Sequence, residues 1–169
     1  MNHQIIINRL ADNKEVFASL LQNIPEELTK WHFDEKKWSL LEIVNHLYDE
    51  EREDFRCRLD LTLGEPAVEW PAIDPANWVT DRNYMDRNFI ESVDAFLNER
   101  KKSIEWLISL DTPNWKSSYH HKLLGPMSAE NILANWLAHD LLHIRQITTI
   151  QWKYLSNMSE SNLSYAGDW

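Results

Sequence analysis

Several residue types on which whole classes of protein depend are scarce in this sequence of 169 residues. The single cysteine, Cys57, excludes an intramolecular disulfide, and one lone thiol is consistent with a reducing, cytoplasmic setting. Three glycines are too few for a P-loop, for the glycine fingerprint of a dinucleotide-binding fold or for hairpin turns. We therefore expect neither of these nucleotide-binding folds and no β-hairpin.

Long apolar runs and clusters of basic residues are also missing. No uncharged stretch approaches the roughly 20 residues of a membrane-spanning helix, and the first residues lack the basic and apolar regions of a signal peptide. The formal net charge of −10 repels nucleic-acid backbones. We expect a soluble, cytoplasmic protein that has no nucleic-acid or membrane partner.

Four long segments carry apolar residues at every third or fourth position, which is typical of amphipathic α-helices. The predicted helices span residues 2 to about 23, residues 39 to about 63, about 27 residues from a cap at Asp81 or Asn83, and residues 128 to 153. Ser39 and Glu42 predict a capping box at the start of the second helix, and Ser128 caps the fourth.

One long connection separates the second and third predicted helices. Residues 65 to about 80 contain Pro66, Pro71 and Pro75, so we expect no regular helix there and enough chain to cross the molecule. Four amphipathic helices with one such crossover predict an all-α four-helix bundle, with residues 1–169 as a single domain. The aromatic residues of the tail after Leu155 predict that it packs on the bundle.

Two histidines, His139 and His143, lie one turn apart on the fourth predicted helix, so their side chains project side by side. Four apolar residues share that half of the helix and two polar residues flank it: Ile132, Trp136, Ile147, Ile150, Asn135 and Gln146. This half is therefore the buried face. Two buried imidazoles could share a metal ion, or they could be core histidines that neighbouring side chains or water satisfy.

A third histidine, His46, lies on the second predicted helix in a polar stripe. The residues beside it on the helical wheel are Glu42, Ile43, Asp49, Glu50 and Glu53. Such a stripe could be a solvated face with a surface histidine. Together with the pair on the fourth helix, however, His46 would complete a site of three imidazoles with an open position, where Glu42 or Asp49 could accept the second ring N–H.

Three segments carry a family resemblance: Lys37–Leu47 (KWSLLEIVNHL), Ala138–Ile147 (AHDLLHIRQI) and Tyr165–Trp169 (YAGDW). They resemble the DinB-like, or YfiT-like, superfamily of metal-binding four-helix bundles, which also includes thiol-dependent S-transferases and maleylpyruvate isomerases. In that family one histidine of the second helix and an H-x-x-x-H pair of the fourth bind a divalent metal. The resemblance implies that His46, His139 and His143 do so here, in a homodimer, with zinc or nickel favoured by imidazole ligands.

The same resemblance implies a function. Relatives activate a low-molecular-weight thiol at the metal and transfer it to an electrophile, or assist an isomerisation through a thiol adduct. We expect Asn135 or Gln146 to orient the substrate, in a cavity that opens onto the metal and is lined by the carboxylates of the second helix and by Trp136. A non-catalytic protein that binds a metal or small molecule is one alternative, and a metal-dependent hydrolase is another.

Other histidine sites fit the sequence less well. A zincin needs a glutamate where Asp140 follows His139, and a ferritin-like di-iron site needs a glutamate three residues before a histidine, which no histidine here has. An HD-type phosphohydrolase could use His139 and Asp140 together with Asp168, but His143 would then have no role. His120 and His121 could line an entrance to the site.

Overall fold

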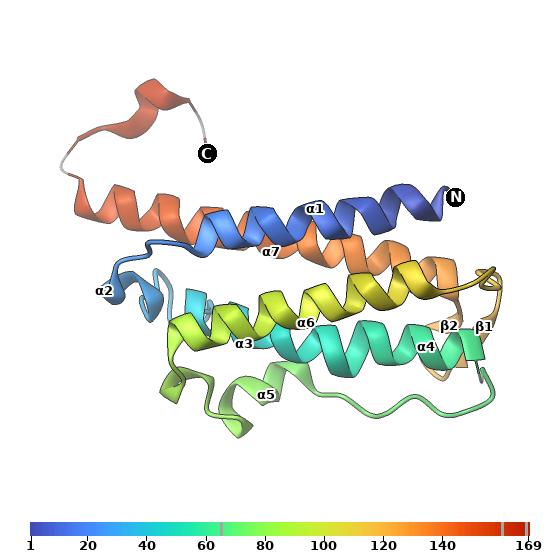
Figure 1. Cartoon of the computed structure of the whole chain (residues 1–169). Coiled ribbons are helices and arrows are strands. Elements are labelled where there is room, and N and C mark those ends of the chain that lie inside the picture. The colour runs from blue at the N-terminus through green and yellow to red at the C-terminus, as the bar shows by residue number, and fades with distance from the viewer. Residues whose placement is uncertain (65, 160, 168) are drawn as a thin grey trace.

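The chain folds as a four-helix bundle (Figure 1), in a computed structural model that describes residues 1–64, 66–159, 161–167 and 169. Its long helices are α1 (His3–Leu21), the continuous helix of α3 (Leu40–Glu50), the π-helical turn η1 (Glu51–Phe55) and α4 (Arg56–Gly64), then α6 (Phe89–Ser109) and α7 (Ala129–Met158). A short α2 (Glu26–Thr29) precedes α3. Both α1 and α3 pack against α6 and α7. The predicted four-helix bundle is confirmed. Asp168, which was considered for an HD-type site, lies outside the described residues.

The predicted caps of two helices are confirmed. The Ser39 hydroxyl accepts from the backbone N–H of Glu42, and the Glu42 carboxylate accepts in return from the backbone N–H of Ser39 at 2.7 Å. The Ser128 hydroxyl accepts from the backbone N–H of Asn131. Because these bonds satisfy N–H groups that a helix start leaves unpaired, they fix where α3 and α7 begin. The caps thereby set the positions of the histidines along the axes of these two helices.

The connection between α4 and α6 runs back along the bundle, because the two helices point in the same direction (Figure 1). It contains α5 (Pro75–Asp81), so the prediction that prolines exclude a regular helix from this segment is wrong. Pro75 lies in the first turn of α5, where its missing N–H needs no partner.

The third long helix begins later than predicted. Asp81 ends α5, and Asn83 has a φ of 49°, in the left-handed region that interrupts a right-handed helix. A 3₁₀ turn, η2 (Tyr84–Asp86), follows, and Asn88 caps α6 by accepting from the backbone N–H of Glu91. The prediction of a cap at Asp81 or Asn83 is therefore wrong.

A β-hairpin lies between α6 and α7, although we expected none. Strand β1 (Ser118–His121) pairs antiparallel with β2 (Gly125–Ser128). Gly125 has a φ of 73°, which glycine adopts without the steric cost that other residues meet, so one glycine is enough for this turn. His121 accepts from two backbone N–H groups of the turn, and His120 is exposed. Within the described residues, neither contacts the other histidines of the bundle.

The longest helix, α7, has 30 residues and leads into the C-terminal tail. No helix within the described residues is both long and apolar enough to cross a membrane. The tail contains the 3₁₀ turn η3 (Leu163–Ala166) and stands away from the bundle (Figure 1). Tyr165 is fully exposed, and only Trp169 makes a described aromatic contact, a stack on Trp152. The prediction that the tail packs on the bundle is therefore wrong apart from this stack.

Candidate metal centre

Three histidines from two helices converge inside the bundle. His46 lies on α3, and His139 and His143 lie one turn apart on α7. The Nε2 atom of His139 is 3.2 Å from that of His46 and 3.0 Å from that of His143. The three ligand atoms all lie within 4.8 Å of one another. Because His46 is only 4% exposed, the alternative of a surface histidine is wrong.

Hydrogen bonds among the imidazoles do not account for this arrangement. A ring nitrogen carries either one proton or one lone pair, so the Nε2 atom of His139 cannot satisfy both of its neighbours. A divalent cation, in contrast, accepts a lone pair from each ring. Nitrogens that bind one zinc ion tetrahedrally at about 2.0–2.1 Å lie about 3.3 Å apart. The donor atoms and their spacing therefore fit a single divalent metal ion.

The other ring nitrogens agree with ligation through Nε2. A neutral imidazole that ligates through Nε2 carries its proton on Nδ1, which then needs an acceptor. The Nδ1 atoms of His46 and His143 are buried and have no hydrogen-bond partner among the described residues. Gln146, three residues after His143, has a buried Oε1 atom that also lacks a partner there. The Gln146 side chain lies close enough to His143 to raise the pKa of that imidazole.

Burial keeps the three imidazoles neutral. Loss of hydration is the largest cause that lowers the pKa of His46 to about 3, of His139 to about 2 and of His143 to about 4. The neighbouring imidazoles lower the pKa values of His46 and His139 further, because adjacent imidazolium ions would repel one another. At neutral pH all three rings therefore have a free lone pair.

We expect the metal-free protein to lose stability as the pH falls from about 6.5 towards 4. Histidines of the unfolded chain bind protons near pH 6.5, while the folded ones stay neutral, so the unfolded state binds more protons in this window. Each histidine contributes a slope of up to about 1.4 kcal/mol per pH unit. Urea denaturation between pH 4.5 and 7.5 should show a smaller slope for His143→Gln than for the wild type, and equal slopes would contradict the account.

Aromatic rings pack against two of the three histidines. The ring centroid of Trp38 is 4.7 Å from that of His46, and the centroid of Phe55 is 5.0 Å from that of His139. His46 and His143 are buried, whereas His139 is partly exposed. The cluster is thus largely enclosed, and His139 is its most exposed member.

Two acidic residues predicted to support the metal have other partners. Glu42 accepts from His32 Nε2 at 2.7 Å in addition to its capping bonds. Asp49 is buried and accepts from the Tyr84 hydroxyl at 2.7 Å. The prediction that Glu42 or Asp49 accepts the second ring N–H of His46 is therefore wrong.

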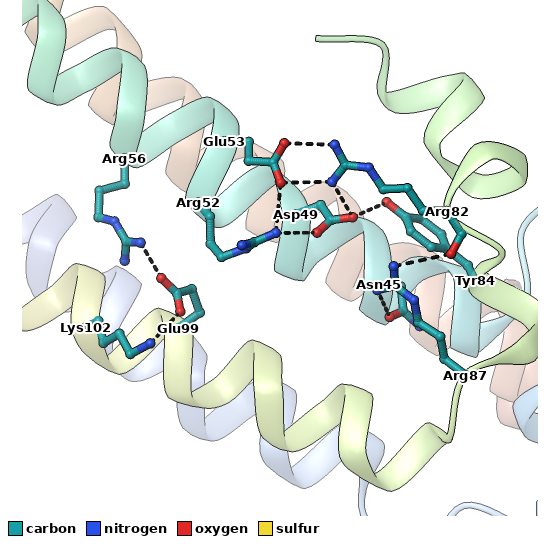
Figure 2. Close-up of polar contacts among 10 residues, drawn as sticks. All are labelled: Asn45, Asp49, Arg52, Glu53, Arg56, Arg82, Tyr84, Arg87, Glu99 and Lys102. Carbon is teal, nitrogen blue, oxygen red and sulfur yellow. Dashed lines mark hydrogen bonds and ion pairs between the residues drawn. The ribbon is translucent and has the colours of Figure 1, made fainter. Parts of the chain in front are cut away.

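The contacts of Asp49 continue into a charged network (Figure 2) that joins α3 and η1 to the crossover. Arg52 donates to Asp49 at 2.9 Å, and Arg82 lies 2.8 Å from the other carboxylate oxygen. Arg82 also binds Glu53 through two parallel bonds of 2.9 and 2.8 Å. These contacts hold the crossover against α3 and η1, and the charge of Asp49 partly offsets the lowering of the His46 pKa that burial and His143 cause.

The third acidic candidate, Glu50, forms a carboxyl pair with Asp54. Loss of hydration is the main cause that raises the pKa of Glu50 far above its ordinary value, and the neighbouring Asp54 raises it further. Loss of hydration also raises the pKa of Asp54, and Arg58, which lies 2.8 Å away, partly offsets this shift. Within the described residues, no hydrogen bond connects Glu50 to the three histidines.

Of the three candidates on α7, only Gln146 lies beside the histidines. Asn135 is exposed and donates to the backbone carbonyl of Asn131 at 2.9 Å. Trp136 is 1% exposed, stacks on Phe55 and donates its Nε1–H to Glu51 at 3.1 Å. Trp136 is thus part of the core beneath the site, and the prediction that it lines a cavity is wrong.

A buried ionic network beneath the histidines was not predicted. Arg100 of α6 donates two bonds of 2.8 Å to Glu51 and bonds of 2.6 and 2.7 Å to Asp140. Asn13 of α1 donates to Asp140 at 3.0 Å, so the network joins all four long helices. Since Asp140 follows His139 directly, these contacts hold α7 at the rotation that points its histidines towards α3.

The charge of Arg100 is maintained by its neighbours. Burial alone would lower the pKa of Arg100, but Glu51 and Asp140 raise it above its ordinary value. The guanidinium therefore stays protonated inside the bundle, and it helps to lower the pKa of His139.

A cavity of about 410 Å³ lies beside the histidines. Its walls consist of Phe33, Lys36, Lys37, Trp38, Ile43, Arg145, Gln146, Thr149 and Ile150. Trp38 contacts His46, and Gln146 lies beside His143, so the cavity and the histidines share a wall. The predicted cavity lined by the carboxylates of the second helix is wrong, because those carboxylates are buried in the networks described above.

The comparison with solved structures agrees with this fold. The chain is similar to a structure titled "YfiT from Bacillus subtilis is a probable metal-dependent hydrolase with an unusual four-helix bundle topology". The TM-score is 0.79 at 17% identity, over 90% of this chain and 87% of that one. At this identity the likeness shows the fold alone.

The comparison with protein families identifies the chain more closely. No curated protein matches it. The model of the DinB superfamily, however, matches residues 9–147, which include all three clustered histidines and most of the bundle. The chain therefore belongs to the DinB superfamily.

Proposed function

We propose that this protein binds one divalent metal ion, zinc or nickel, through the Nε2 atoms of His46, His139 and His143, and transfers a low-molecular-weight thiol to an electrophile. The convergence of three neutral imidazoles is the observation that carries the metal site. The resemblance to thiol-dependent S-transferases supports the choice of a thiol as nucleophile.

A bound divalent metal would lower the pKa of a thiol so that the thiolate forms at neutral pH. The chain supplies the surroundings for this chemistry. Trp38 and Phe55 pack on His46 and His139, and the cavity that Trp38 helps to line has room for a substrate. The thiol sulfur forms the new bond to the electrophilic carbon, the leaving group departs with its electron pair, and the thiol proton passes to solvent.

Hydrolysis is the second candidate function. The same three imidazoles can hold a metal that activates water in place of a thiol. The structural likeness to YfiT, which is described as a probable metal-dependent hydrolase, favours this alternative.

An assay with generic substrates separates the candidates. We expect zinc- or nickel-loaded protein to accelerate the reaction of cysteine or glutathione with 1-chloro-2,4-dinitrobenzene, and His139→Ala to lose at least about 100-fold of that rate because a ligand is gone. His120→Ala, on the exposed hairpin, is the matched control and should keep the wild-type rate. Thiol-independent hydrolysis of p-nitrophenyl acetate would instead favour a hydrolase, and bound metal without turnover would leave a binding protein.

A further inference from the structure

Of the described residues that line the cavity beside the histidines, three are basic and none is acidic. Lys36 and Lys37 come from the loop before α3, and Arg145 comes from α7. The whole chain has a formal net charge of −10, so most of its surface repels anions. The cavity therefore differs in charge from the protein as a whole.

The positive charges of the cavity are available to a ligand. Among the described residues, none of the side chains of Lys36, Lys37 and Arg145 forms an ion pair. In contrast, Arg52 of η1, Arg56 of α4 and Arg82 of the crossover pair with carboxylates, as shown in Figure 2. The nearest described acidic contact is that of Asp34, which accepts from the backbone N–H of Lys36 rather than from its side chain. An external carboxylate or phosphate would meet cations that have no internal partner.

The remaining walls suit the body of a small organic molecule. Phe33, Trp38, Ile43 and Ile150 are apolar, and the Thr149 hydroxyl donates to the backbone carbonyl of Arg145 at 2.7 Å. A volume of about 410 Å³ lies within the range of about 300–1,000 Å³ that is typical of small-molecule sites. The combination of cations and apolar walls selects an anion that carries an apolar or aromatic part.

The cavity is also placed to present its ligand to the histidines. The wall formed by Trp38 and Gln146 contacts His46 on one helix and adjoins His143 on the other. The cavity is therefore separated from His46 and from His143 by a single side chain on each side.

We propose that this cavity binds a small organic anion, a carboxylate or phosphate on an apolar body, and that this molecule is a substrate of the histidine centre. Its assignment as a substrate rests on the proposed function, whereas anion binding does not. The basic residues bind the oxyanion, and Trp38 and Phe33 contact the apolar body.

Calorimetric titration of the metal-free protein tests the binding with four probes: benzoate, phenyl phosphate, the neutral isostere benzamide and inorganic phosphate. We expect benzoate or phenyl phosphate to bind at least about fivefold more tightly than benzamide, and their binding to weaken at 0.5 M salt. Lys37→Gln and Arg145→Gln should each raise the dissociation constant about fivefold. The controls Lys101→Gln and Arg9→Gln remove the same charges from exposed positions outside the cavity and should have no effect.

Each outcome decides a separate claim. Equal binding of benzoate and benzamide, no binding at 10 mM, or equal effects of cavity and control variants would overturn the proposal. If inorganic phosphate binds as tightly as phenyl phosphate, the claim that the ligand has an apolar part is wrong, because the apolar walls would then contribute nothing to binding. His139→Ala should bind benzoate as the wild type does, since it leaves the cavity walls intact. If the protein binds the anion but takes up no zinc or nickel when these ions are supplied, the proposed function is refuted and the anion site is not.

The substrate assignment has its own test in the metal-loaded protein. We expect 4-chloro-3-nitrobenzoate to react with glutathione at a higher kcat/KM than 4-chloro-3-nitrobenzamide, mainly through a lower KM, and Lys37→Gln to remove the difference. If Lys37→Gln still prefers the benzoate to the benzamide, the claim that the cavity binds the substrate of the histidine centre is wrong.

Discussion

Replacing His139 with alanine is expected to abolish tight metal binding. Its Nε2 atom lies within 3.2 Å of the Nε2 atoms of both other histidines, so the substitution removes the central donor of the three. Structural zinc sites with four ligands bind with roughly 10–16 kcal/mol, so one ligand accounts for a loss of about 100- to 1,000-fold in affinity. Competition with a chromophoric chelator at pH 7.5 measures this loss in protein purified without an affinity tag.

His120→Ala is the control for this experiment, because His120 is exposed on the hairpin and outside the cluster. It should leave the affinity and the content of about one metal ion per chain unchanged. His139→Ala that retains wild-type affinity would show that the metal lies elsewhere.

Replacing Arg100 with methionine is expected to destabilise the protein by about 3–5 kcal/mol. The guanidinium is the partner of two buried carboxylates, Glu51 and Asp140, and methionine fills similar space without a charge. Both carboxylates would then stay buried without their cation. Removing one partner of a buried ion pair destabilises a protein more than replacing both partners does. Urea denaturation of the metal-free variant at pH 7.5 measures the change in the free energy of unfolding.

Lys101→Met is the matched control, because the adjacent lysine is 66% exposed and only weakly paired with Glu105. We expect it to change stability by less than about 0.5 kcal/mol. If Arg100→Met were as stable as this control, the network would not hold the four helices together.

Apolar periodicity was enough to predict the four long helices, because each buries one face in a common core. The capping box of Ser39 and Glu42 and the cap at Ser128 also predict where α3 and α7 begin, since such caps depend on local sequence. Helix phase alone cannot show whether a polar stripe is buried. The burial of His46 therefore could not be predicted from its own helix. Its convergence with His139 and His143 comes from the packing of α3 against α7.

The sequence contains a pattern that indicates the buried ionic network, and our sequence-based prediction of the fold did not use it. Arg100 falls between Phe96 and Ile104 on the apolar stripe of α6, and Glu51 follows Leu47 by four residues on the stripe of α3. A lone charge on an apolar stripe of one helix indicates an opposite charge on another. The π-helical turn that carries Glu51 has no comparable local signal, because its wider turn depends on the contacts made after packing.

The hairpin and the crossover were mispredicted for a local reason. Counting glycines across the chain overlooks the fact that a single one at the required position, such as Gly125, makes a turn. Counting prolines likewise overlooks that Pro75 is acceptable in the first turn of α5. In both cases the position of the residue decides the structure, and composition does not.

The anomalous difference map of a crystal soaked in zinc or nickel at pH 7.5, without chelator, tests the central claim most directly. We predict one peak per chain, at about 2.0–2.1 Å from the Nε2 atoms of His46, His139 and His143, with a fourth position that no protein side chain fills. A saturated crystal whose peaks lie elsewhere, or whose three histidines bind no metal, would contradict the account.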